Sequence, residues 1–445
     1  MDDIEPNKGK MLIQPTFNVY RSSSQEMESG DRFNIIFCGD LFINTCKEKD
    51  ESNVEQRFGD TLKAILSSAD ISVLNLEAPL TYSKNSIKKS GPTLKMKPSV
   101  GESLHRIGFT GFTLANNHIM DFGCVGLTDT LKFAEKCGVK TCGAGPDIVN
   151  AVKPMIFESP SGFKIGIFSF CEQEFGATKD NAPGSAWISH PMILTTIRQY
   201  RAYIDFIIVA AHGGLEYVPF SPLDRQSQLR QLIDAGADIV IGHHPHVPQG
   251  WEKYNDKIIF YSLGNFIFDY LGKDKHPKSN WGYMVHVIFN KNQLSSVNLI
   301  LTEQRSCIVD VIEDESKSGL HYRHLLHLSN IIGDSAIYEK YWQDLAVRLY
   351  FERYAPRLKR TLLHPFSFEG LLSLFMSIKP RTNRSHEDNF QSQLKQNNRV
   401  LLNLFRNESH RSAICKALSV LGEQEKDLTN TDISEDLDKL LTEVR

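Results

Sequence analysis

The sequence predicts an α/β domain with a central, largely buried sheet, followed by a helical C-terminal region. Two observations indicate this fold class. Between residues 33 and 303, short apolar runs rich in β-branched residues alternate with helix-like segments, as in βα units. Over residues 321–421 the strand-like runs stop and apolar residues recur at helical spacing. A chain of 445 residues is long enough to bury a sizeable core and to form a second region.

The expected elements follow in order along the chain. Residues 1–32 are polar and without periodicity, so we expect a flexible N-terminal arm. The α/β domain is expected over 33–305, the helical C-terminal region over 306–421, and a frayed helix or acidic tail over 422–445. The expected strands are 33–37, 71–76, 109–115, 163–170, 206–211, 237–242, 257–264, 281–289 and 297–303, and the clearest helices of the domain are 54–69, 125–138 and 221–236. Gly138 and Gly236 are expected to end two of these helices.

Composition and charge exclude several classes of protein. The chain has 50 Lys and Arg against 53 Asp and Glu, a net charge of -3, and 41% hydrophobic residues, which excludes global disorder. This balance argues against a nucleic-acid binder, so no nucleic acid is expected among the partners. The eight cysteines include no Cys-x-x-Cys pair, and we interpret them as mostly buried, reduced thiols.

The sequence also bears on localisation. Acidic residues follow Met1 and no apolar run occurs near the N-terminus, so we expect a cytoplasmic protein with no signal peptide and no transmembrane segment. Residues 355–381 carry Arg and Lys at both ends of an apolar stretch, an arrangement that suits a peripheral position at the inner membrane face. A buried helix with a solvated rim is the alternative for this segment.

Residues of metal-ligand type stand at the ends of five of the predicted strands. They are Asp40, then Glu77, then Asn116, Asn117 and His118 with Asp121 after them, then His212, and finally His243, His244 and His246. The carboxyl ends of parallel strands form one rim of a sheet, so these side chains are expected to converge. A mixed set of oxygen and nitrogen ligands suits a pair of divalent cations such as zinc, manganese or iron. Each residue alone would fit a turn or an ordinary surface histidine, but their shared position favours a metal site.

Six sequence blocks show a family resemblance. GDLFIN (39–44), NLEAPLT (75–81), ANNHIMDFG (115–123), HGGLEY (212–217), GHHPHVPQG (242–250) and YSLGNFIFD (261–269) resemble, in order, the blocks of CapA-type proteins of bacterial capsule and poly-γ-glutamate synthesis. That family resembles a branch of the calcineurin-like metallophosphatases. The resemblance covers about residues 33–303. It implies a layered αββα sandwich, here with an added helical C-terminal region, and a hydrolase that uses two divalent metal ions (Mn, Fe or Zn).

The resemblance implies a role for each matching residue. Asp40 would bind the first metal, Glu77 would bridge both metals, Asn117 would bind the second, and His212, His244 and His246 would be the histidine ligands. His118, oriented by Asp121, would contact the leaving group as the catalytic residue. Two positions depart from the family pattern. Phe42 stands where the wider superfamily has a histidine ligand, which His243 could replace, and Gly213 stands where an aromatic residue would narrow the pocket.

A further set of residues near the blocks could bind substrate or support the ligands. These candidates are Asn116, His243, Glu216, Tyr217, Gln249, Asn265 and Asp269. Packing of the rim is the alternative for Tyr217, and a turn with a buried aspartate cap is the alternative for Asn265 and Asp269. Orienting a ligand histidine is one possible role for Gln249, and the absence of such a role is the alternative. His321, His324 and His327, spaced three apart, are interpreted as a solvent-facing helix rather than a metal site.

The ligand set indicates a reaction. Two cations about 3.5 to 4 Å apart would lower the pKa of a bridging water to about 7 and supply hydroxide at neutral pH. Hydrolysis of a phosphoester is the favoured reaction, and cleavage of a γ-glutamyl amide in an anionic polymer uses the same groups. A capsule-synthesis membrane complex is a further expected partner. The alternative function is a catalytically idle, metal-binding partner that positions the polymer or a membrane synthase, and the absence of a histidine at Phe42 favours it.

Overall fold

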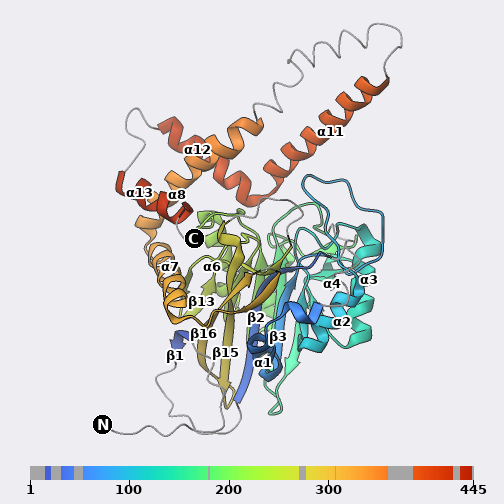
Figure 1. Ribbon diagram of the computed structural model, residues 1–445, viewed down its shortest axis with the longest axis vertical. Helices are drawn as coiled ribbons and strands as arrows, with labels where there is room; N and C mark the ends of the chain where they lie inside the picture. Colours follow the sequence, from blue (N-terminus) through green and yellow to red (C-terminus); the bar gives the residue numbers. More distant parts are fainter. Residues whose placement is uncertain are drawn as a thin grey trace.

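Two β-sheets packed face to face form the centre of the protein, with helices on both outer faces (Figure 1). The computed structural model describes residues 16–21, 32–44, 54–178, 181–269, 277–305, 307–358, 384–423 and 431–442. The strands of the first sheet, in spatial order, are β1 (Thr16–Arg21), β16 (Gln293–Arg305), β15 (Trp281–Asn290), β2 (Arg32–Phe42), β3 (Ile71–Leu76), β4 (Gly111–Thr113) and β5 (Lys140–Cys142), with β14 (Asn265–Phe268) paired to β2 and β17 (Ile308–Val311) to β16.

The second sheet lies against the first. Its strands, in spatial order, are β12 (Trp251–Tyr254), β13 (Lys257–Phe260), β11 (Ile239–His243), β10 (Phe206–His212), β8 (Lys164–Cys171) and β7 (Met155–Glu158), and β6 (Ala144–Gly145) pairs with β9 (Gly184–Ser185) in a separate ribbon. Strands β2, β3, β4 and β5 are parallel, as are β8, β10, β11 and β13. Each parallel set therefore presents its carboxyl ends at one edge of its sheet.

The alternation of side chains along β2 shows how the layers are held together. Ile35 and Phe37 enter the core between the two sheets, and Ile36 and Cys38 face the opposite side, where they pack against helices. Successive strand residues point to opposite faces, so a strand that is apolar at every position is buried on both faces. The continuous apolar runs of the sequence arise from this double burial.

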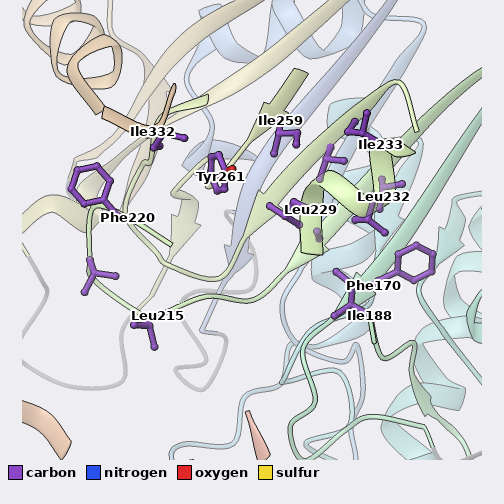
Figure 2. Packing of buried hydrophobic residues seen from close by; sticks show 14 of the residues in the cluster. Phe170, Ile188, Leu215, Phe220, Leu229, Leu232, Ile233, Ile259, Tyr261 and Ile332 are labelled. Atoms are coloured by element: carbon purple, nitrogen blue, oxygen red, sulfur yellow. The ribbon is translucent and has the colours of Figure 1, made fainter. Parts of the chain in front are cut away.

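Helices cover the outer face of each sheet. The helices of the α/β region are η2 (Val54–Arg57), α1 (Asp60–Ser68), α2 (Pro98–Ile107), α3 (Gly123–Cys137), α4 (Ile148–Ala151), α5 (Met192–Tyr200), α6 (Leu223–Asp234) and η3 (Pro277–Asn280). Helices α1, α2 and α3 pack on the first sheet and α6 on the second. Figure 2 shows Leu229 and Leu232 of α6 in the same apolar cluster as Ile259 of β13. Gly138 and Gly236 have φ of 73° and 121° and follow α3 and α6, as predicted.

The C-terminal region is helical; its first helix lies along the side of the sandwich and the later helices gather at one end (Figure 1). Its helices are α7 (Glu315–Gly333), α8 (Ser335–Leu349), the π-helical turn η4 (Tyr350–Tyr354), α11 (Arg384–Arg406), α12 (Glu408–Glu423) and α13 (Thr431–Thr442). Tyr338 and Trp342 of α8 are buried in the same apolar cluster as the second sheet. The predicted fold class, a layered αββα sandwich with an added helical region, is confirmed by this arrangement. Among the described residues, no helix combines the length and the apolar character needed to cross a membrane.

Three details at the ends of the regions differ from the sequence-based expectations. Thr16–Arg21, inside the segment predicted as a flexible arm, form β1 because they pair with β16. Ile308–Val311 add a strand beyond residue 305 by pairing with the other part of β16. Within the segment 422–445, residues Thr431–Thr442 form α13, whose Leu437 and Leu440 are buried, so the helical alternative holds there. Of the segment 355–381, residues 359–381 lie outside the described part of the chain.

Two side-chain expectations are also corrected. Among the seven cysteines described, all are free thiols, but Cys124, Cys307 and Cys415 are exposed rather than buried. His321 is buried rather than solvent-facing, because its ring stacks on Trp281 with 4.1 Å between the ring centroids. His327 is exposed and pairs with Asp436 of α13.

Candidate metal centre

The predicted ligands lie where the carboxyl ends of the parallel strands of both sheets meet. Glu77 directly follows β3, and His212 and His243 are the last residues of β10 and β11, paired in register. Asp40 lies within β2 rather than at its end, because β14 pairs with β2 up to Phe42. The convergence expected from the sequence is therefore present, and several strands of both sheets contribute ligand residues, with His243, His244 and His246 all at the end of β11.

Asp40 is fully buried and is held by donors from three elements. Its Oδ1 accepts hydrogen bonds from Asn75 Nδ2 at 2.8 Å and from His243 Nδ1 at 3.0 Å, and its Oδ2 accepts one from the backbone N–H of His244 at 3.0 Å. Burial alone would raise the pKa of Asp40, but the hydrogen bond and charge of His243 and the charge of His246 hold that pKa below its ordinary value. Asp40 is therefore ionised and fixed in direction.

Glu77 is fully buried, and neither of its carboxylate oxygens has a hydrogen-bond partner among the described residues. Its Oε1 lies 3.7 Å from His212 Nε2 and 3.6 Å from His246 Nε2. Burial and the charges of Asp40 and Glu216 raise its pKa well above the ordinary value. An unsatisfied buried carboxylate is costly, and a bound cation is a group that satisfies it.

Three more ligand atoms face Glu77. His212 Nε2 lies 3.1 Å from His244 Nδ1 and 3.1 Å from Asn117 Oδ1. Ligand atoms around one zinc-like cation at 2.0–2.1 Å are about 3.3 Å apart, so these separations fit a shared cation. Burial lowers the pKa of His212 and His244 well below the ordinary value, which leaves both imidazoles in the neutral form that binds metals.

The candidate ligand atoms form overlapping groups, each with its atoms within 4.8 Å of one another. The groups are Asp40 with Glu77 and His246, Glu77 with His212 and His244, and Glu216 with His244 and His246. The first two groups share Glu77. The described residues thus hold buried His, Glu and Asp clusters that could bind metal.

Unusual backbone conformations aim the histidines. His244 has φ of 98° and His246 has φ of 58°, and such left-handed values are rare for residues other than glycine. Consecutive residues of a strand would point to opposite faces, but the turn after His243 lets His243 bind Asp40 while His244 faces His212. Strained conformations of this kind cluster at functional sites.

His118 forms a compact group with Asp121 and Lys89 beside the ligands. His118 Nδ1 donates to Asp121 Oδ2 at 2.6 Å, since a carboxylate can only accept, and Lys89 Nζ donates to Asp121 Oδ1 and to the backbone oxygen of Asn117. Burial and the charge of Lys89 lower the pKa of His118 to about 4. The orientation of His118 by Asp121 agrees with the prediction, and Lys89 adds a buried cation to this pair.

Several other predicted residues have structural contacts. Asn116 Oδ1 accepts the backbone N–H groups of His118 and Ile119 and shapes the turn, and the Nδ1 atom of His243 donates to Asp40. Asn265 Oδ1 accepts from His246 Nδ1 at 2.9 Å, so it orients that histidine. Phe42 packs against Phe268.

The structure gives two further candidates partners outside the ligand set. Gln249 does not meet a ligand histidine: it donates to the Val218 carbonyl and accepts from Ser221, and so fixes the loop after β10. Asp269 forms a two-fold ion pair with Arg57, with both contacts at 2.6 Å, and its Oδ2 also accepts the backbone N–H of Asn44 at 2.9 Å, which agrees with the alternative of an aspartate cap. Both residues are candidates because they lie in a sequence block, but the partners of their side chains come from distant segments.

Glu216 and Tyr217 lie at the rim of the centre. Glu216 is exposed, and its backbone oxygen accepts from Arg353 of η4 at 2.8 Å. Tyr217 has φ of 59°, its N–H donates to the Pro245 carbonyl, and its ring lies 5.8 Å from that of His246. Tyr217 therefore packs on a candidate ligand and ties the two histidine loops together.

Comparison with known proteins identifies the family. A family model described as "Bacterial capsule synthesis protein PGA_cap" matches residues 34–270, more than half of the chain. The chain belongs to this family. The resemblance to the CapA-type capsule proteins that the sequence blocks predicted is thereby confirmed.

Relatives in several bacteria show the same family likeness. The PGA biosynthesis protein CapA of Bacillus subtilis (strain 168) is 36% identical over 251 residues, which cover 54% of this chain and 64% of the relative. The capsule biosynthesis protein CapA of Bacillus anthracis is 34% identical over 215 residues, 46% of this chain and 52% of the relative. A probable polyglutamine synthesis accessory protein of Mycobacterium tuberculosis (strain ATCC 25618 / H37Rv) is 28% identical over 232 residues, 49% of this chain and 61% of the relative. The matched segment thus spans about half to two thirds of each relative's length.

Solved structures with some likeness are more distant. A 5'-nucleotidase from Candida albicans SC5314 has a TM-score of 0.36 at 12% identity and covers 63% of this chain and 54% of that chain. A protein from Thermus thermophilus has a TM-score of 0.34 at 10% identity and covers 63% of this chain and 99% of that chain. The fold assignment rests on the two sheets described above and not on these low scores.

Three residues at this PGA_cap centre were missed by the sequence reasoning. Asn75 stands two residues before Glu77 on the same face of β3, a spacing that could have revealed it. Glu174 follows β8, so the strand-end rule that found the ligands would have found it as well; burial raises its pKa to about 7. Lys89 lies in a segment without periodicity, and the sequence carries no signal for it.

Proposed function

We propose that this PGA_cap protein is a dinuclear metal-dependent hydrolase that acts in bacterial capsule, poly-γ-glutamate or other exopolymer biosynthesis. The observation that carries the proposal is Glu77, a fully buried carboxylate without a hydrogen-bond partner among the described residues, shared by two groups of candidate ligands. A carboxylate with two oxygens can bridge two cations. When bound, such cations act as Lewis acids and lower the pKa of coordinated water.

The residues divide between two positions. Asp40, Glu77 and His246 would hold the first cation, and Glu77, His212 and His244, with Asn117, would hold the second. The donor set of carboxylates, a carboxamide and imidazoles accepts Mn, Fe or Zn. Asn265 would keep the Nε2 atom of His246 directed at Glu77, since it engages the Nδ1 atom.

His118 is proposed as the residue that contacts the leaving group or the phosphoryl group. Asp121 holds its Nδ1 atom, which leaves Nε2 for the substrate. The ammonium group of Lys89 donates to Asp121 and offsets the negative charge of that carboxylate beside the centre. The substrate is proposed to be a phosphoester, with a γ-glutamyl amide of an anionic polymer as the second bond type. A capsule-synthesis membrane complex at the inner membrane face is the proposed partner, and nucleic acid is not.

The test combines metal analysis with an activity assay on the full chain. Purified wild type, His246→Ala and the control His105→Ala, which removes an exposed histidine from α2, are analysed by plasma mass spectrometry and assayed with a chromogenic phosphodiester and with poly-γ-glutamate. We expect two equivalents of metal in wild type and control, turnover of at least one substrate, and a loss of at least 100-fold in His246→Ala. A wild type without bound metal would refute the proposal.

A catalytically idle metal-binding partner is the second candidate. It is favoured by Phe42, whose ring packs on Phe268 where the wider superfamily has a histidine ligand. Two equivalents of metal in the wild type, together with no turnover of either substrate, would select this function.

A further inference from the structure

The junction between α11 and α12 forms hydrogen bonds with the segment that follows β8, next to the metal centre. Three consecutive residues on each side are in contact. Ser409 Oγ donates to Glu172 at 2.5 Å, the backbone N–H of Gln173 donates to Glu408 at 2.9 Å, and Asn407 Nδ2 donates to Glu174 at 3.0 Å. Figure 1 shows α12 at the end of the sandwich where the C-terminal helices gather. A segment more than 230 residues away in sequence therefore reaches the site region.

Asn407 cannot turn its side chain without a loss. It precedes α12 as the N-cap residue, and its Oδ1 accepts the backbone N–H of His410 at 2.9 Å. If the carboxamide rotated by half a turn, Nδ2 would face that N–H, and the capping hydrogen bond would be lost. The amide hydrogens of Asn407 are thus aimed at Glu174 by the helix that follows.

Glu174 in turn contacts Asn117, a candidate ligand. Its carboxylate accepts a hydrogen bond from the side chain of Asn117, and the donor is Nδ2, because the oxygen of that carboxamide cannot donate. With Nδ2 held by Glu174, Oδ1 of Asn117 faces His212 Nε2 at 3.1 Å. A carboxamide that rotated by half a turn would offer the cation two N–H donors in place of an oxygen.

We propose that Glu174 is a positioning residue that orients Asn117 toward the second cation, and that Asn407 of the C-terminal region holds Glu174 in place. This inference rests on the proposed metal centre. It gives the helical region a role in the site itself, since the α11–α12 junction sets the direction of a ligand two contacts away. Partners that orient metal ligands in this way typically change metal affinity by 10- to 100-fold when they are removed.

The experiment is a Mn²⁺ titration of the metal-free full chain by calorimetry. In Glu174→Gln, the new carboxamide has one acceptor and must present its NH₂ to the donor of Asn117 or of Asn407. In Asn407→Asp, two carboxylates face each other. Both single variants are expected to weaken the second Mn²⁺ equivalent by 10- to 100-fold and to leave the first within about 3-fold.

The double variant Glu174→Gln with Asn407→Asp tests the direction of the hydrogen bonds. Its carboxamide at position 174 can donate to the carboxylate at 407 and still accept from Asn117, and aspartate is a good N-cap. We expect the second affinity to return to within about 3-fold of the wild type. If Glu174 acted through its charge or as general support, the double variant would bind as weakly as the single ones.

A matched control separates positioning from loosening of the helix. Lys416→Ala removes the ion pair of α12 with Glu339 of α8, which includes no candidate ligand, and is expected to bind both equivalents like the wild type. Unfolding followed by circular dichroism establishes whether each variant is folded. If a single variant is not folded, Asn407→Ala is measured in its place. Wild-type affinity in the single variants, no recovery in the double variant, or weak binding in Lys416→Ala would each overturn this inference alone. A wild type that binds no Mn²⁺ would overturn the proposed function together with it.

Discussion

Individual buried carboxylates differ in how they are satisfied, and this difference marks the site. Asp40 and Asp121 are fully buried, and each accepts two or more hydrogen bonds from neighbouring residues. Glu77 is equally buried, but neither of its oxygens has a hydrogen-bond partner in the described part of the chain. A folded protein tolerates such a group when something outside the polypeptide satisfies it, and the surrounding imidazoles indicate a cation.

Glu77→Gln is expected to stabilise the metal-free protein. Because the pKa of Glu77 is raised above its ordinary value of 4.5, the unfolded chain releases its proton more easily, and wild-type stability falls as the pH rises above about 4.5. The variant lacks this loss, so its free energy of unfolding should exceed that of the wild type by about 1 to 3 kcal/mol at pH 7.5, and by little near pH 4.5. Urea unfolding in EDTA measures the difference.

Saturating Mn²⁺ provides the matching control for Glu77→Gln. A cation bound to the native state stabilises the wild type more than a variant that binds it weakly, so the order of stability should reverse. If the wild type is more stable than Glu77→Gln in EDTA at pH 7.5, the interpretation of Glu77 as a metal ligand is contradicted.

Asp269→Ala is expected to reduce stability without changing metal content. The ion pair with Arg57 is two-fold and largely buried, and removal of one partner leaves the guanidinium without its acceptor. The free energy of unfolding should fall by about 2 to 4 kcal/mol, whereas Asp60→Ala, at a fully exposed side chain, should leave it nearly unchanged. Urea unfolding and plasma mass spectrometry provide the two measurements, and a loss of metal in Asp269→Ala would restore it to the site.

At the scale of the elements, the turns decide what the strand ends can do. Strand β11 delivers His243 and His244 to the same place, yet one orients Asp40 and the other faces His212. The left-handed residues Tyr217, His244 and His246 make this division, and the hydrogen bond from Tyr217 to Pro245 joins the two turns. Two identical side chains in succession thus acquire different functions from the backbone between them.

Helix α7 offers a test of packing that is independent of the metal centre. Both ring nitrogens of His321 lack a hydrogen-bond partner among the described residues, and burial, with Lys317 nearby, lowers its pKa to about 4. Trp281, Lys317 and Glu303 are the groups around it. The unfolded chain therefore binds this proton more readily, and the contribution of His321 to stability is lost as the pH falls from about 6.5 to 4.

His321→Phe is expected to keep the stacking on Trp281 and to remove this acid sensitivity. The variant should be more stable than the wild type by about 1 kcal/mol at pH 7, since two unsatisfied nitrogens are removed, and the gap should widen as the pH falls. His105→Ala, on the exposed side of α2, should follow the wild type at every pH. Equal pH dependence of His321→Phe and wild type in urea unfolding would count against a buried, neutral His321.

At the scale of the whole molecule, the C-terminal helices share a core with the sandwich. Phe220 lies 5.8 Å from Tyr338 and 5.7 Å from Tyr341 between ring centroids, and Tyr338 OH donates to the Ser221 carbonyl. Together with the contacts of Asn407 and Ser409, this packing joins the helical region to the rim of the site. An adaptor attached to an independent enzyme domain would be expected to show a more polar and separable interface.

The metal-free protein is therefore expected to unfold in one calorimetric transition. Tyr338→Ala opens a cavity in the shared core and should lower the stability of the whole protein by about 3 to 5 kcal/mol, shifting that single transition. Scanning calorimetry in EDTA with far-UV and near-UV circular dichroism measures it. Two transitions, of which Tyr338→Ala shifts one, would show that the helices form a separate unit.

The amino-acid sequence specified the fold class and the chemical character of the site, because both are written in short-range patterns. Apolar runs with flanking turns gave the strands, and polar residues at the strand ends gave Asp40, Glu77, Asn117, His212, His244 and His246, which the structure brings together. Periodicity is local, so these features need no knowledge of distant contacts.

Folding in three dimensions assigned the partners. It paired Gln249 with Val218 and Ser221 and Asp269 with Arg57, placed Lys89 beside Asp121, and placed Asn407 beside Glu174. Each of these outcomes depends on a hydrogen bond or ion pair between segments far apart in the chain. Such pairings form only when the layers have packed, and no local pattern records them.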